Sequence, residues 1–135
     1  MKYRRKNLLS LVLFFLFTSQ AIAEDSICQK SPFVKGACFN VLGVLNVYNG
    51  WPPPLRIEPN SKGNLYAIGP VENELMPTSI AKILPSEVEG EFELCPFNET
   101  TSVPYDERKI EMVCIQAVRN AQYWDQKTGT KKKLK

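Results

Sequence analysis

The four cysteines are the residues of this sequence with the clearest chemistry. They are Cys28, Cys38, Cys95 and Cys114, and the chain contains no histidine. Without histidine, neither a Ser-His-Asp nor a Cys-His catalytic arrangement can be built. No zinc ligand set is present either, because no cysteine pair has the C-x-x-C spacing. We therefore expect two disulfides, and of the three possible pairings we favour Cys28–Cys38, which closes a short loop, and Cys95–Cys114, which joins two neighbouring strands.

Carboxylates are the next candidates for chemistry. Glu89, Glu91 and Glu93 alternate along one segment, so they lie on one face of a predicted strand. Such a face is typical of a solvated strand, but paired carboxylates also serve as the acid and base of a hydrolase. The chain has no Gly-rich phosphate loop and no calcium-loop pattern. The sequence thus favours a non-catalytic protein without metal or cofactor, with a carboxylate-based hydrolase as the alternative.

A candidate binding surface surrounds a predicted turn. Its residues are Tyr48, Asn49, Trp51, Arg56 and Tyr66. Trp51 lies between the Asn49-Gly50 turn and three prolines, which makes it a rigid platform for a sugar or a peptide. We expect Arg56 to point outward and to bind a carboxylate or a phosphate. In the alternative interpretation, Trp51 folds over the end of the domain and Arg56 pairs with Glu58 or another acidic residue.

Residues 1–23 have the three zones of a signal peptide: a basic start, an apolar run of about ten residues and the Ala21-Ile22-Ala23 site. The run is shorter than the roughly 20 residues that span a bilayer. We therefore expect cleavage before Glu24, a periplasmic or secreted protein and no stable membrane span.

Charge argues against nucleic acid as a partner. The chain has 17 basic and 14 acidic residues, but four of the basic residues belong to the leader. Five more lie in residues 127–135, so the body of the domain, residues 24–126, carries a net charge of −6. An acidic body repels a phosphate backbone. Residues 127–135 are predicted to form a disordered basic tail.

Hydrophobic alternation predicts five strands and one helix in a single domain. The strands cover residues 39–48, 55–58, 64–68, 89–94 and 110–118, and Gly43 indicates a bend in the first of them. The helix covers residues 77–84, Pro96 is expected to end the fourth strand, and residues 98–109 are expected to form a polar loop. This order is that of an all-β, five-stranded, OB-like Greek-key barrel. A small β-sandwich and an α+β sheet are the alternatives.

Five segments resemble a group of small exported bacterial proteins. They are CFNV (38–41), VYNG (47–50), LRI (55–57), FELCPF (92–97) and MVCI (112–115). The group has a YNG-x-P-x-x-R-I centre followed by F-E-V-C-P-F and M-V-C-V strands, and no activity is assigned to it. The resemblance implies a Gram-negative, periplasmic or exported protein in which Cys95 and Cys114 are structural. Here Glu58-Pro59 replaces the aromatic residue expected after the R-I pair.

These observations together predict a small exported β-barrel that acts by binding. The expected ligand is an envelope glycan or protein. The alternatives are a structural or inhibitory envelope protein and the carboxylate-based hydrolase described above.

Overall fold

The computed structural model describes residues 27–69 and 75–135 of the chain. Its elements are β1 (Phe39–Val47), β2 (Leu55–Pro59), β3 (Leu65–Ile68), α1 (Thr78–Ala81), β4 (Val88–Thr101), β5 (Ile110–Asp125) and β6 (Thr130–Lys133). Strands dominate because apolar and polar residues alternate along most of these segments. The predicted leader, residues 1–23, lies outside the described residues.

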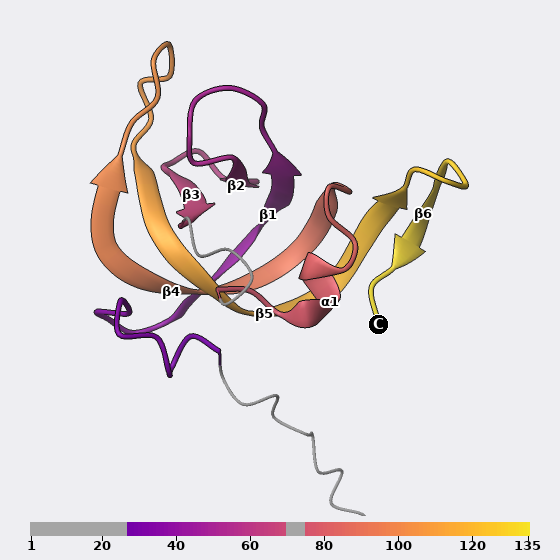
Figure 1. Cartoon of the computed structure of the whole chain (residues 1–135), viewed down its shortest axis with the longest axis horizontal. Helices are drawn as coiled ribbons and strands as arrows, with labels where there is room; N and C mark the ends of the chain where they lie inside the picture. The colour runs from indigo at the N-terminus through magenta and orange to yellow at the C-terminus, as the bar shows by residue number, and fades with distance from the viewer. Residues whose placement is uncertain (1–26, 70–74) are drawn as a thin grey trace, which may run out of the picture.

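Five of the strands close into a barrel (Figure 1). Antiparallel pairing joins β3 to β2, β2 to β1, β1 to β4 and β4 to β5, and β3 pairs with β5 in parallel to close the ring. The short helix lies between β3 and β4 in the chain. The strand order, with its single parallel closure, confirms the predicted small OB-like barrel.

Gly43 lies where β1 is shared between two ladders. It pairs with Pro59 of β2 and with Gly90 of β4. A Cβ atom at this position would lie 2.5 Å from the backbone oxygen of Glu58, so only glycine allows the two strands to approach this closely. Gly43, where the sequence indicated a bend, is the first residue of β1 that pairs with both neighbours, and this double pairing continues to Leu45.

The interior of the barrel is filled by apolar side chains from every barrel strand. The largest fully buried side chains are Phe92, Leu45, Ile57 and Ile68 of the strands, together with Met76 and Ile80 from the segment between β3 and β4. The predicted helix is shorter than expected, because residues 82–85 form turns rather than helix. Ile80 still reaches the core, and the Leu75 carbonyl accepts a hydrogen bond from the Ile115 amide of β5 at 2.8 Å.

β4 and β5 are longer than the sequence predicted. β4 continues through Pro96, although proline has no backbone N–H to donate to a ladder. The Pro96 carbonyl still accepts a hydrogen bond from the Lys35 amide at 2.8 Å. The β4–β5 ladder shifts its register between Pro96 and Thr100, which accommodates the missing donor. The polar loop therefore begins after Thr101 rather than at Asn98.

The prediction of a disordered tail at residues 127–135 is wrong. β6 pairs with β5 from Gln122 to Asp125. The Asp125 carboxylate accepts hydrogen bonds from the Lys127 amide and the Lys132 ammonium, and the Leu134 amide donates to the Ala121 carbonyl at 2.9 Å. These bonds hold the last residues as a hairpin, although the side chains of β6 are exposed.

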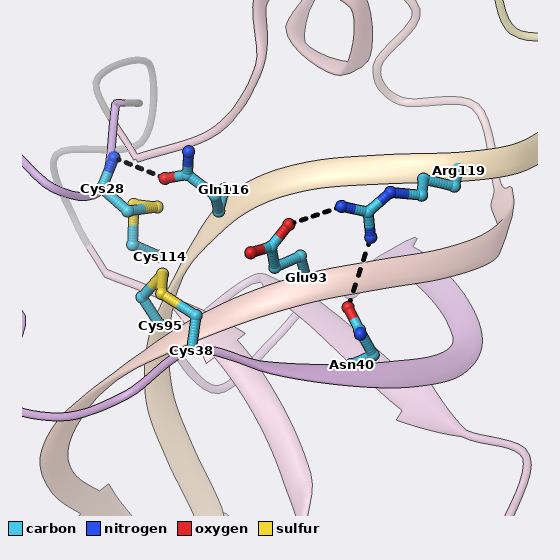
Figure 2. Close-up of a disulfide and its surroundings, with 8 residues drawn as sticks. All are labelled: Cys28, Cys38, Asn40, Glu93, Cys95, Cys114, Gln116 and Arg119. Carbon is cyan, nitrogen blue, oxygen red and sulfur yellow. Dashed lines mark hydrogen bonds and ion pairs between the residues drawn. A yellow bond between two sulfur atoms is a disulfide. The ribbon is translucent and has the colours of Figure 1, made fainter. Parts of the chain in front are cut away.

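The structure contains two disulfides, as predicted, but the predicted pairing of the four cysteines is wrong. The bonds are Cys28–Cys114 and Cys38–Cys95, with Cα–Cα distances of 5.7 Å and 4.1 Å (Figure 2). The register explains the second bond, because β1 starts with Phe39 opposite Leu94 and so places Cys38 opposite Cys95. The segment before β1 then carries Cys28 to β5, where its amide donates to the Gln116 side chain at 3.3 Å.

No helix in the described part of the chain combines the length and hydrophobicity that a membrane crossing requires.

Candidate binding site

Arg56 is an anchor of the β1–β2 loop and not the outward-pointing ligand that the sequence predicted. It is 8% exposed, and its Nε donates to the Pro53 carbonyl at 2.8 Å while another nitrogen donates to the Trp51 carbonyl. Its guanidinium lies 4.7 Å from the centre of the Tyr48 ring. A buried cation needs such partners. Arg56 therefore satisfies the carbonyls of a proline-rich loop that lacks amide donors.

Tyr48 belongs to the same anchor. Its amide donates to the Pro54 carbonyl at 2.7 Å, which closes the base of the loop. Burial, and secondly the negative charge of Glu58, raise the pKa of its hydroxyl above 10.0. Tyr48 is thus a neutral structural side chain whose ring supports Arg56.

Trp51 projects from this anchored loop. Its side chain is 62% exposed, and Asn49 beside it is exposed as well. The alternative in which Trp51 folds over the domain is therefore wrong. The loop lies at the same end of the barrel as the β4–β5 loop (Figure 1). Trp51 is thus an exposed aromatic platform, whereas Arg56 is buried, and the two side chains do not form one ligand surface.

The outer face of β2 and β3 is covered by the chain itself. Val103 of the β4–β5 loop packs in a small apolar cluster with Leu65, Ala67 and Ile110. Arg108 from the same loop forms an ion pair with Glu58 at 2.8 Å and another with Asp106. Hydrogen bonds from Arg108 hold the pKa of the Asp106 carboxyl at about 2. The face on which the sequence placed a ligand is consequently closed by this loop.

Tyr66, the fifth predicted residue, lies in a groove away from Trp51. The groove has a volume of about 460 Å³ and runs between the first half of β1 and the β2–β3 turn. The Tyr66 and Phe39 rings form its aromatic part, with centroids 5.4 Å apart and planes tilted by 55°. Burial, and secondly the Glu111 charge, raise the pKa of the Tyr66 hydroxyl.

Polar side chains also line this groove. They are Asn40, Asn60, Ser61, Asn64 and the cationic Lys62. The Asn64 amide donates to Glu111 at 2.8 Å and is held in place. Asn60 is exposed at the turn, and its side chain makes no hydrogen bond among the described residues. The sequence predicted Tyr66 but not its neighbours, because residues 59–63 carry only a turn signal and no ligand-binding pattern.

The three glutamates that suggested a hydrolase lie on the outer face of β4, which is flanked by β1 and β5 and is not an edge strand. Arg119 of β5 forms an ion pair with Glu93 at 2.8 Å and also donates to Asn40 (Figure 2). Lys131 of β6 pairs with Glu89 at 3.0 Å. Two of the three carboxylates thus have cationic partners.

The described residues contain no group of three or more side chains arranged to hold a metal ion. Comparison with protein-family models, with curated proteins and with solved structures finds no match to this chain.

Proposed function

We propose that this chain is a non-catalytic binding module for a glycan of the cell envelope. The observation that carries the proposal is the groove of about 460 Å³ in which the aromatic pair Phe39 and Tyr66 lies beside amide side chains. Small-molecule sites have this size and this mixture of apolar walls with a few polar groups. An aromatic face packs against the apolar face of a sugar ring, and amides such as Asn60 exchange hydrogen bonds with its hydroxyls.

Export is the second part of the proposal. The two disulfides indicate an oxidising environment for folding. Residues 1–23 have the zones of a cleaved leader, which supports a periplasmic or secreted location. An extracytoplasmic location places the groove among the glycans of the envelope.

The pairing of the carboxylates supports binding over hydrolysis. A general acid and base need carboxylates that are free to exchange protons with the substrate. Glu93 is instead held by Arg119 and Glu89 by Lys131. The groove that contains Tyr66 has no acidic side chain in its wall.

A protein partner is the second candidate, and the exposed Trp51 favours it. Tryptophan is enriched among the residues that dominate protein interfaces, and a loop held by Arg56 presents it at low entropic cost. The loop surface and the Tyr66 groove are separate, so a single experiment distinguishes them.

Titration of the ¹⁵N-labelled protein with neutral oligosaccharides, followed by chemical shifts, tests the proposal. We expect shifts to cluster at Tyr66, Asn60 and Asn64. Replacing Asn60 by Ala removes an exposed ligand group without touching the core, and should weaken binding about fivefold, the loss of about one hydrogen bond. Trp51→Ala is the matched control and should bind normally. Shifts confined to Trp51 would move the sugar site from the groove to the β1–β2 loop and refute the groove, and an unresponsive spectrum across the panel would refute the glycan.

A further inference from the structure

A second groove adjoins the first one. It has a volume of about 300 Å³ and lies on the outer face shared by β1, β4 and β5. Leu42 and Asn60 line both grooves, so the two are contiguous. Leu42 is 60% exposed on this shared wall, so an apolar side chain lies between the two grooves.

A break in the β4–β5 ladder shapes the second groove. Glu89 pairs with Gln122 and Glu91 with Arg119, so that two residues of β5 lie opposite the single Gly90. Asn120 takes up the extra residue with a φ of 51°, and a Cβ on Gly90 would lie only 3.0 Å from that of Ala121. Such bulges redirect a side chain and are frequent beside functional sites. Here Asn120 and Gln122 both line the groove, and neither side-chain amide is bonded within the described residues.

The wall of the second groove has an excess of negative charge. Its ionisable side chains are Glu89, Glu91 and Lys131. Lys131 is engaged by Glu89 at 3.0 Å. The Arg119 side chain, on the residue opposite Glu91, is directed to Glu93 and Asn40 instead. The Glu91 carboxylate therefore has no ion-pair or hydrogen-bond partner among residues 27–69 and 75–135.

We propose that the two grooves form one cleft for an oligosaccharide and that the second groove selects a sugar with a free amino group. The inference rests on the proposed glycan-binding function and specifies its ligand. One sugar ring packs on Tyr66 and Phe39, and the oligosaccharide then passes Leu42 and Asn60. The ammonium of the next sugar then binds the Glu91 carboxylate, while Asn120 and Gln122 bond its hydroxyls.

The test compares a β-1,4-linked glucosamine trimer with its fully N-acetylated counterpart. Both have the same ring chain, but only the first carries ammonium groups. We expect the amino trimer to bind about tenfold more tightly in calorimetry at low salt, and the difference to shrink as salt rises, because the contact is partly exposed. Glu91→Gln should remove the difference and leave the affinity for the acetylated trimer unchanged. Glu99→Gln, an isosteric change on an exposed part of β4 that lines neither groove, is the control.

The outcomes separate this inference from the function on which it rests. If both trimers shift Tyr66 and bind equally, and Glu91→Gln has no effect, the amino-sugar inference is overturned and the glycan-binding function stands. If neither trimer nor any neutral oligosaccharide shifts Tyr66, the proposed function itself fails. Binding of the amino trimer that shifts Glu91 and Gln122 without Tyr66 would overturn the continuous cleft.

Discussion

At the scale of single residues, Arg56 and Tyr66 show how a side chain takes its role from its surroundings. Both are polar residues next to a turn, and the sequence assigned both to ligand binding. Arg56 is buried by Tyr48 and by the loop whose carbonyls it binds, whereas Tyr66 opens onto a groove. A proline-rich loop offers carbonyls without matching amides, and Arg56, the second residue of the strand that follows the loop, is the donor that satisfies two of them.

Arg56→Ala should destabilise the fold by about 2 kcal/mol, because it removes charged hydrogen bonds to two carbonyls and leaves both partly buried without a donor. Urea unfolding followed by fluorescence measures the change. Arg119→Ala is the matched control: it also removes an arginine, but one whose partner is the Glu93 carboxylate and whose side chain is half exposed, and we expect a loss below about 1 kcal/mol. Equal losses in the two variants would show that Arg56 does not anchor the loop.

At the scale of elements, the sequence predicted the strands whose residues alternate and missed those held by turns. β1, β2 and β3 lie close to their predicted ranges because apolar positions recur every second residue. β6 is a run of threonine and lysines without an apolar face, and it is held by its ladder with β5, by the Asp125 turn and by the bond from Leu134 to Ala121. Of the residues that line the proposed cleft, the sequence predicted Tyr66 but not Asn120 and Glu91, since a bulge brings these two to one groove.

The β5–β6 hairpin should loosen in acid. Hydrogen bonds from the Lys132 ammonium and the Lys127 amide hold the pKa of Asp125 at about 2, below its usual 3.8. A folded-state pKa below the unfolded value adds stability that is present above pH 4 and is lost as the pH falls towards 2. Amide exchange of residues 127–131 should therefore accelerate between pH 4 and pH 2, relative to amides of β1. Asp125→Asn should abolish this pH dependence, and its persistence in that variant would exclude Asp125 as the cause.

At the scale of the whole molecule, the disulfides connect the segment before the barrel to its two longest strands. Cys38–Cys95 continues the β1–β4 ladder by one position, and Cys28–Cys114 fastens the start of the described chain to β5. The sequence separations are 57 and 86 residues, far longer than in the expected pairing. The alternation of apolar and polar residues within strands does not reveal which strand an irregular N-terminal segment crosses. The pairing of the cysteines could therefore not be predicted from their spacing in the sequence. Each bond now constrains most of the domain.

Because the loops are long, each disulfide should stabilise the fold by about 4 kcal/mol in the chain-entropy model. A domain of this size has a total stability of about 5–15 kcal/mol, so reduction should bring the barrel close to unfolding at 37 °C. The paired replacements Cys38→Ser with Cys95→Ser, and Cys28→Ser with Cys114→Ser, should each lower the urea midpoint without excluding the other bond. Non-reducing peptide mapping of the native protein provides the direct check. Peptides linked through Cys28 and Cys38 to each other would contradict this arrangement, since the N-terminal segment would then be free of β4 and β5.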